Sequence, residues 1–192
     1  MMEIRFHGRG GQGTVIASIL LSKALFQAGY QVQSFPVFGV ERRGAPVEAY
    51  VRFDKEPILV RTNVYRPDHV VVQDHTLLQS VDVTRGLKKG GWIIINSPAP
   101  PDDVSPFQGF QLAYVDASRI ALRNKLGTRT HPIVNTPMLG AVSRVFDMPS
   151  MDAIAAAIRE EVPRETERNL KAARDAYDEV RRIGLIEQKQ VS

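Results

Sequence analysis

Three glycines near the N-terminus, Gly8, Gly10 and Gly13, have the spacing G-x-G-x-x-G. Glycines at this spacing let the backbone turn tightly and approach a ligand, and the N–H groups at a helix N-terminus favour an anion. These glycines follow an apolar segment at 4–6 and precede a nearly continuous apolar run over 14–28. We therefore expect an anion-binding loop between a strand and a helix. Its residues are Gly8, Arg9, Gly10, Gly11, Gln12, Gly13 and Thr14.

The end of the next expected strand bears on which anion this loop would bind. A dinucleotide site needs an acidic residue there, roughly 20 residues after the glycines, to hold the ribose hydroxyls. Residues 33–36 contain no acid, and Glu41 lies further on, so NAD is disfavoured. Arg42 and Arg43 leave NADP as a second choice. No Gly-Lys-Ser/Thr follows the glycines, which excludes a triphosphate-binding loop. The alternative is that the glycines only let the first helix pack closely on the sheet.

Asp74 and His75 follow another expected strand and are the other candidates for chemistry. We expect Asp74 to cap the turn after that strand, since no serine or cysteine partner for a catalytic pair is evident. The remaining histidines, His7, His69 and His131, lack the spacing of metal ligands. The sequence therefore predicts neither a catalytic residue nor a metal site.

The elements that would position these residues alternate between strands and helices. Of the 192 residues, 43% are apolar and 24% charged, as in ordinary globular proteins. We expect one domain over 1–192, a three-layer α/β/α fold with a Rossmann-like, mostly parallel sheet. The expected strands are 4–6, 31–35, 47–53, 70–73, 92–95 and 112–116, and 47–53 could pair with 57–60 as a hairpin. The expected helices are 14–28, 136–146 capped by Thr136, one after Ser150, and an outer charged helix over 164–183.

Composition also excludes several classes of site. The chain has no cysteine, which excludes disulfides, thiolate zinc sites, a cysteine nucleophile and cysteine-ligated iron–sulfur clusters within it. A net charge of +4 is too small to indicate nucleic-acid binding. Apolar stretches fall far short of the roughly 20 residues that a membrane span needs. We expect a cytoplasmic protein that binds neither nucleic acid nor membrane.

Four segments in order resemble the gamma subunit of 2-oxoacid:ferredoxin oxidoreductases. They are 6–13 (FHGRGGQG), 35–46 (FPVFGVERRGAP), 67–74 (PDHVVVQD) with 76–78 (TLL), and 135–141 (NTPMLGA). The stretch from Glu41 to Pro46 looks most like pyruvate- and 2-oxoisovalerate-type members and less like 2-oxoglutarate types. The resemblance spans nearly the whole chain.

The resemblance implies a division of labour between subunits. Such enzymes oxidatively decarboxylate a 2-oxoacid with coenzyme A, giving an acyl-CoA, CO2 and reduced ferredoxin. Thiamine diphosphate, Mg²⁺ and [4Fe-4S] clusters sit mainly on the alpha, beta and delta subunits or equivalent fused domains. The isolated chain is then expected to bind none of them and to be inactive. The resemblance leaves open which 2-oxoacid is used.

Two loops are expected to meet at a subunit surface near coenzyme A. One is the glycine loop, and the other contains Glu41, Arg42, Arg43 and Gly44, with Arg9 or Arg42 placed to contact the phosphates. The alternatives are a stand-alone NADP-dependent oxidoreductase and a purely structural scaffold subunit, in which the loop touches only protein.

Overall fold

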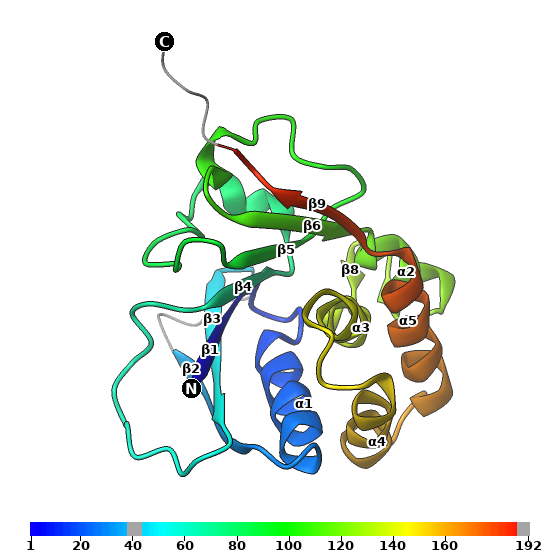
Figure 1. Ribbon diagram of the computed structural model, residues 1–192. Helices are drawn as coiled ribbons and strands as arrows, with labels where there is room; N and C mark the ends of the chain where they lie inside the picture. Colours follow the sequence, from blue (N-terminus) through cyan, green and yellow to red (C-terminus); the bar gives the residue numbers. More distant parts are fainter. Residues whose placement is uncertain (38–43, 188–192) are drawn as a thin grey trace.

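The computed structural model describes residues 1–37 and 44–187, which contain a seven-stranded sheet in the order β2-β3-β1-β4-β5-β6-β9 (Figure 1). Five strands run in one direction, and β3 and β9 run in the other. The strands are β1 (Met2–Arg9), β2 (Gln31–Val37), β3 (Pro46–Asp54), β4 (His69–Val72), β5 (Trp92–Asn96), β6 (Gln111–Val115) and β9 (Arg181–Leu185). A small separate pair consists of β7 (Gly127–Thr128) and β8 (His131–Pro132).

Both faces of the sheet are covered, which confirms the expected three-layer α/β fold. Figure 1 shows the α-helices of the described chain on one face. They are α1 (Thr14–Gln27), α2 (Ala117–Arg123), α3 (Asn135–Phe146), α4 (Met151–Glu161) and α5 (Thr166–Glu179). The other face is covered by loops and the short 3-10 helices η1 (His75–Gln79) and η2 (Ser105–Phe107). No helix among the described residues is long and apolar enough to cross a bilayer.

The expected hairpin of 47–53 with 57–60 is wrong. β3 instead pairs with β2 on one side and β1 on the other, with Gln31 opposite Asp54 and Met2 opposite Phe53. Residues 57–60 form no strand. The antiparallel hairpin in the sheet is therefore β2–β3, and β3 separates the two strands that flank α1.

Two expectations about the C-terminal half are also corrected. The helix expected over 164–183 ends at Glu179, and the chain from Arg181 forms an antiparallel edge strand against β6. Thr136 does not cap α3, because its hydroxyl donates to Asn169 Oδ1 at 2.8 Å. By contrast, the expected Ser150 cap of α4 is confirmed, with Ser150 Oγ accepting from Ala153 N.

α3 and α5 approach each other closely at one glycine. A Cβ added to Gly140 would lie 1.8 Å from the carbonyl oxygen of Ala173, so only glycine fits there. The same two helices bury Ala172, Ala173 and Ala176 from α5. Small residues thus hold α5 against α3, while its outer side remains charged.

β1 carries different chemistry on its two faces. Ile4 and Phe6 face the helices, whereas Glu3, Arg5 and His7 point toward the loop-covered face and are buried. The cross-strand partners of this polar row on β3 are Arg52, Tyr50 and Glu48, respectively. A ladder of charged and polar side chains therefore lies beneath the loops of that face.

Candidate functional site

The glycine loop lies where the connections that follow two neighbouring strands, β1 and β4, run to opposite faces of the sheet. α1 follows β1 on the helical face and leads toward β2, whereas the chain after β4 enters η1 on the opposite face and leads toward β5 (Figure 1). In open α/β sheets, ligands bind in the crevice at the carboxyl ends of the strands at such a point. Here that point lies beside the glycine loop and Gln73–Asp74, which follow the neighbouring strands β1 and β4.

The glycine loop is joined to the second loop that the sequence singles out. The Gly10 N–H donates to Ala45 O at 2.9 Å, and the Gly44 N–H donates to Gly10 O at 3.1 Å. Gly44 therefore lies directly against the glycine loop. Glu41, Arg42 and Arg43 lie outside the described residues.

The guanidinium of Arg9 makes three contacts within the chain. Its Nε donates to Asp74 Oδ2 at 3.1 Å, its Nη2 to Thr76 Oγ1 at 2.8 Å, and its Nη1 to Gly44 O at 3.1 Å. The positive charge of Arg9 is thus paired with Asp74 and bridges the glycine loop to the start of η1. In this arrangement Arg9 supports the loop from within the molecule.

Asp74 caps η1, as the sequence predicts. Its Oδ1 accepts from Thr76 N at 3.0 Å, while Oδ2 accepts from Gln12 Nε2 at 2.8 Å. Gln12 in turn accepts from the Arg9 N–H at 2.8 Å. Burial alone would raise the pKa of Asp74, but hydrogen bonds from Thr76 and Gln12 and the charge of Arg9 together lower it below its usual value. Asp74 is therefore an ionised structural anchor.

Close packing explains two glycines of the motif. A Cβ on Gly8 would lie 2.0 Å from Thr14 Oγ1, and one on Gly13 would lie 2.9 Å from Asn135 Nδ2. Gly13 also has a φ of 77°, which favours glycine. The glycines thus bring the start of α1 against both Gln73 and the start of α3, and the packing alternative describes part of what they do.

Two buried side chains beside the glycine loop lack partners. The Thr14 hydroxyl and both amide atoms of Gln73 have no hydrogen-bond partner among the described residues, and Gln73 is fully buried. Buried polar groups are normally satisfied by protein, water or a ligand. These groups lie at the N-terminus of α1, where unpaired N–H groups favour an anion. Sequence reasoning missed Gln73, although its place directly after a buried strand was a usable signal.

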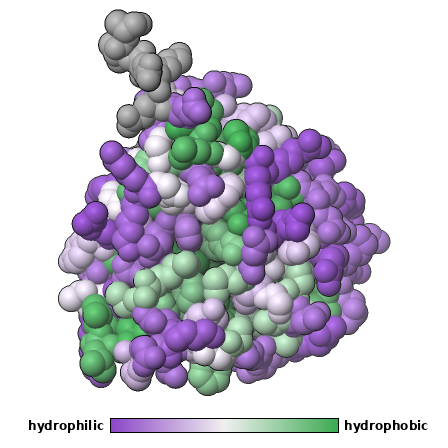
Figure 2. All heavy atoms as spheres, viewed as in Figure 1, coloured by the Kyte–Doolittle hydropathy of each residue, from purple (hydrophilic) through white to green (hydrophobic). Residues whose placement is uncertain are grey.

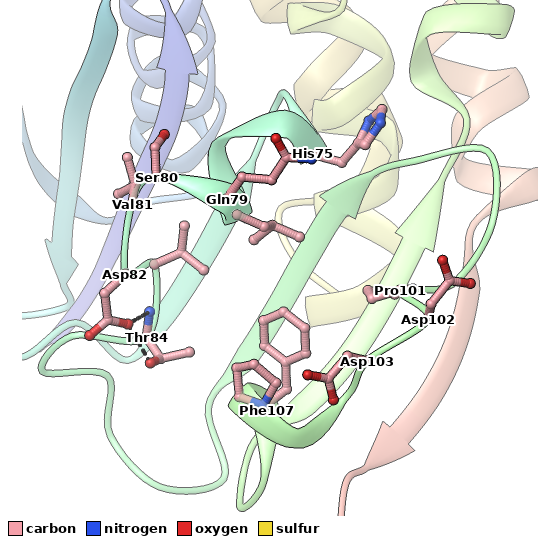
Figure 3. Close-up of a pocket in the computed structure, with 13 residues that line it drawn as sticks. His75, Gln79, Ser80, Val81, Asp82, Thr84, Pro101, Asp102, Asp103 and Phe107 are labelled. Carbon is pink, nitrogen blue, oxygen red and sulfur yellow. Dashed lines mark hydrogen bonds between the residues drawn. The ribbon is translucent and has the colours of Figure 1, made fainter.

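Two cavities flank η1 at this edge of the sheet. One of about 730 Å³ lies between η1 and the loop around Pro101 and Asp103 (Figure 3). A second, of about 670 Å³, lies at the ends of β5 and β6 and is lined by Asn96, Ser118 and Arg119. His75 lines both cavities. The glycine loop itself lines neither of them.

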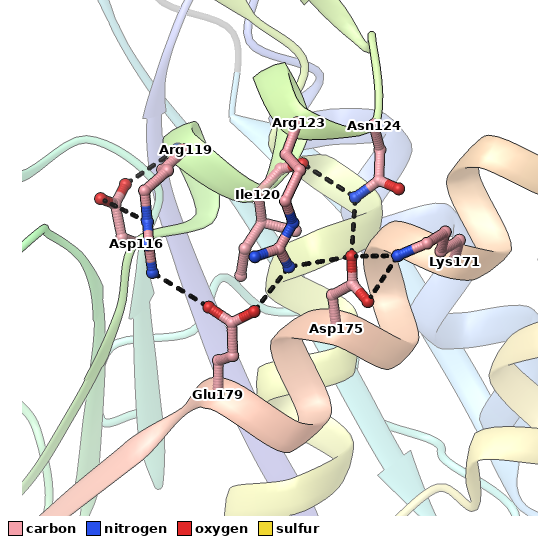
Figure 4. A network of polar contacts seen from close by, with 8 residues as sticks. All are labelled: Asp116, Arg119, Ile120, Arg123, Asn124, Lys171, Asp175 and Glu179. Atoms are coloured by element: carbon pink, nitrogen blue, oxygen red, sulfur yellow. Dashed lines mark hydrogen bonds and ion pairs between the residues drawn. The ribbon is translucent and has the colours of Figure 1, made fainter.

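The arginines beside the second cavity are neutralised by α5. Arg119 Nη2 lies 3.1 Å from Glu179 Oε2, and Arg123 Nη2 lies 2.9 Å from Asp175 Oδ2 (Figure 4). Asp175 also accepts from Asn124 and Lys171. This network fastens α2 to α5, so these arginines serve the fold.

The histidines have structural surroundings. His69 stacks on Phe146 with ring centroids 4.4 Å apart and accepts from the Trp92 N–H. His7 is buried, and burial together with the charge of Arg5 lowers its pKa to about 4 despite nearby Glu48. Across residues 1–37 and 44–187, no group of three His, Asp or Glu side chains is placed to hold a metal ion.

Comparison with known proteins identifies the family. The model of the pyruvate ferredoxin/flavodoxin oxidoreductase family matches residues 3–179. The chain belongs to this family. Within it, the chain is 47% identical over 182 residues to the pyruvate/ketoisovalerate oxidoreductases common subunit gamma of Pyrococcus abyssi, covering 93% of this chain and 96% of that protein.

Two further members of the pyruvate ferredoxin/flavodoxin oxidoreductase family agree over nearly the full length. Pyruvate synthase subunit PorC of Methanocaldococcus jannaschii is 48% identical, and the match covers 94% of this chain and 97% of that subunit. The crystal structure of pyruvate oxidoreductase subunit PORC from Thermotoga maritima superposes with a TM-score of 0.80 at 38% identity, covering 95% and 98% of the two chains. The resemblance to the gamma subunit is thereby confirmed.

Proposed function

We propose that this chain is the gamma subunit of a multi-subunit 2-oxoacid:ferredoxin oxidoreductase of pyruvate or 2-oxoisovalerate type. The single observation that carries this proposal is the near-complete, two-way coverage by proteins named as gamma or PorC subunits. The enzyme would convert a 2-oxoacid and coenzyme A to an acyl-CoA and CO2, passing two electrons to ferredoxin.

The redox and decarboxylation chemistry belongs, in this proposal, to the alpha, beta and delta subunits. Thiamine diphosphate with Mg²⁺ would supply the stabilisation of the carbanion, and [4Fe-4S] clusters would carry the electrons. The residues of this chain do not fit these groups, because it has no cysteine and its described part holds no cluster of acidic and histidine ligands. The isolated chain is accordingly proposed to be inactive.

The glycine loop is proposed to face coenzyme A at a subunit boundary. Its support is the place of the loop at the ends of the paired strands β1 and β4, where the N-terminus of α1 lies beside the unpartnered Thr14 hydroxyl and Gln73 amide. A phosphate there would receive N–H and hydroxyl donors. The second loop, 41–44, would complete this surface, with Arg42 in place of Arg9 as the cation.

One observation favours the structural alternative, in which the loop touches only protein. Arg9 uses its Nε and both terminal nitrogens on Asp74, Thr76 and Gly44. A loop fixed so firmly from within is also suited to docking against another subunit. The two roles differ in one measurable quantity, the Michaelis constant for coenzyme A in the assembled enzyme.

Reconstitution of the complex tests the proposal. Ferredoxin reduction with pyruvate or 2-oxoisovalerate should require coenzyme A and should be lost when this chain is omitted. In the complex, Thr14→Val and Arg42→Ala should raise the Michaelis constant for coenzyme A, whereas the exposed control Arg129→Ala should not. Unchanged constants with intact assembly would support the structural alternative. A rise in melting temperature of the isolated chain with NADPH would instead favour an NADP-dependent oxidoreductase.

A further inference from the structure

The loop that joins β3 to β4 exposes large apolar side chains. Leu59 is 88% exposed and Tyr65 is 73% exposed, and Val60 is exposed beside Leu59. Figure 2 shows hydrophobic residues gathered at the lower left of the molecule, where Figure 1 has this protruding loop. We call residues 57–66 the 57–66 loop. Clustered apolar exposure of this kind is typical of surfaces that contact another protein.

This loop is held in one shape by two side chains of the sheet, buried Arg52 and half-buried Gln33. Arg52 Nη1 donates to Val60 O at 3.2 Å and its Nη2 to Thr62 O at 3.0 Å, while Gln33 Nε2 donates to Ile58 O at 3.2 Å. The carbonyl oxygens of Ile58, Val60 and Thr62 are thus each hydrogen-bonded to a side chain of the sheet. Buried Val64 anchors the far end of the loop.

Arg52 is an unusual residue to use for this purpose. Its side chain is 1% exposed, and its Nε donates to Glu3 Oε1 at 2.7 Å. A buried cation needs an ionic partner and hydrogen bonds to offset its desolvation. Here Nη1 donates to Gln33 Oε1 and Val60 O, and Nη2 donates to Thr62 O, in a loop whose side chains are mostly exposed. Fixing a binding loop before association lowers the entropy lost on binding.

The charges near the loop define the chemistry of its partner. Residues 57–66 contain two arginines and no acidic residue. A cavity of about 480 Å³ beside the loop is lined by Phe35, Arg52, Arg61 and Asn63 among others, with no Asp or Glu. It adjoins β2, which is the end strand of the described sheet. The same loop exposes Leu59 and Tyr65, so its surface is both apolar and cationic, and arginine and tyrosine are enriched at binding hot spots.

We propose that the 57–66 loop and the adjoining cavity dock an apolar, carboxylate-bearing segment of another subunit. Leu59 and Tyr65 supply the apolar contact, Arg61 pairs with a carboxylate of the partner, and Arg52 is a positioning residue beneath them. This inference rests on the proposed function, because it takes the partner to be a subunit of the same oxidoreductase. It adds to that function a surface remote in sequence from the glycine loop.

The test uses the full chain and the remaining subunits of the oxidoreductase, purified as a subcomplex. Leu59→Ser and Arg61→Glu should each raise the dissociation constant for that subcomplex roughly thirtyfold. The matched controls Phe26→Ser, at an exposed phenylalanine of α1, and Arg129→Glu, at an exposed arginine of the β7–β8 turn, should leave it within about twofold of the wild type.

A labelling experiment gives an independent readout. Because the chain has no cysteine, Leu59→Cys introduces a single thiol. Maleimide should label this thiol rapidly in the free chain and slowly in the complex, while Phe26→Cys should react equally in both.

Each other outcome counts against the proposal. Equal losses in test and control variants, or no loss with Leu59→Cys still labelled in the complex, would overturn the docking surface alone. Self-association of the isolated chain that Leu59→Ser abolishes would assign the surface to a second copy and overturn the proposed occupant. If the wild type does not bind the subcomplex, the proposed function fails and this inference fails with it.

Discussion

Arg9 and Asp74 form an ion pair between the glycine loop and the turn after β4, with Arg9 Nε 3.1 Å from Asp74 Oδ2. The same carboxylate caps η1 through the Thr76 N–H and accepts from Gln12. One side chain therefore fixes the relative position of two loops at the carboxyl edge of the sheet. Replacing Asp74 therefore tests how much this contact stabilises the glycine loop.

Asp74→Asn should lower the free energy of unfolding at pH 7 by about 1–3 kcal/mol, because Arg9 loses its charged partner. The pKa of Asp74 lies below its unfolded value, so its stabilisation is present above about pH 4 and is lost as the pH falls through the folded pKa. In urea unfolding, the difference in the free energy of unfolding between Asp74→Asn and the wild type should be smaller at pH 3 than at pH 7. Exposed Asp102→Asn is the control, and a difference that stays constant with pH contradicts the prediction.

His7 should make the protein acid-sensitive in a different pH window. Its pKa falls from 6.5 to about 4 in the folded chain, so the unfolded chain binds the proton first. Stability should therefore decrease from pH 6.5 to about 4, by on the order of 3 kcal/mol. His7→Gln should reduce this slope, as measured by urea unfolding across that range, and the remainder should come from His69, whose pKa is also lowered by burial. Exposed His131→Gln should keep it, and an unchanged slope in His7→Gln would show that other groups cause it.

Gly140→Ala should destabilise the packing of α3 on α5. The added methyl group would overlap the Ala173 carbonyl, and such overpacking costs roughly 3 kcal/mol. Gly29→Ala provides the control, because Gly29 has open space around it but a φ of 81°, where a side chain costs about 1 kcal/mol. Thermal and urea unfolding should rank the two variants in this order. Equal losses would mean that α5 moves away at no cost.

Arg52→Met should be among the most destabilising single changes, at about 3–5 kcal/mol, because it leaves Glu3 buried without its cation. The control is Arg168→Met, since Arg168 pairs with Glu165 on an exposed helix surface. That change should cost under about 1 kcal/mol. Replacing Glu3 and Arg52 together by Leu should cost less than Arg52→Met alone. Denaturant unfolding of the three variants measures all of these values.

Local signals in the sequence were sufficient for the elements nearest the site. β4, β5 and β6 are short apolar runs, and α1 begins directly after Gly13 and ends before Gly29, so their expected bounds are close to those observed. Asp74 at the end of β4 was correctly expected to cap the next turn. Each of these features depends on residues within one turn or one strand, which is why a single sequence reveals them.

Long-range pairing accounts for what could not be predicted. β3 lies between β1 and β2 because it also pairs with β1, from Arg9 opposite Pro46 to Met2 opposite Phe53, and no local sequence pattern indicates this long-range pairing. β9 begins with Arg181 and Arg182, whose charge looks like a continuation of the helical surface before it. The contact of Arg9 with Asp74 and the isolation of Gln73 likewise depend on tertiary placement.

During synthesis on the ribosome, the order of strands in the sheet divides assembly into an early and a late part. β1 lies inside the sheet, and both of its neighbours, β3 and β4, are complete by Val72. Half of the sheet can therefore pair while the second half of the chain is still being made. The opposite edge of β6 stays open until Leu185 has emerged, because β9 closes it last. Nascent chains are consequently exposed to aggregation at that edge from the completion of β6 at Val115 until β9 has emerged.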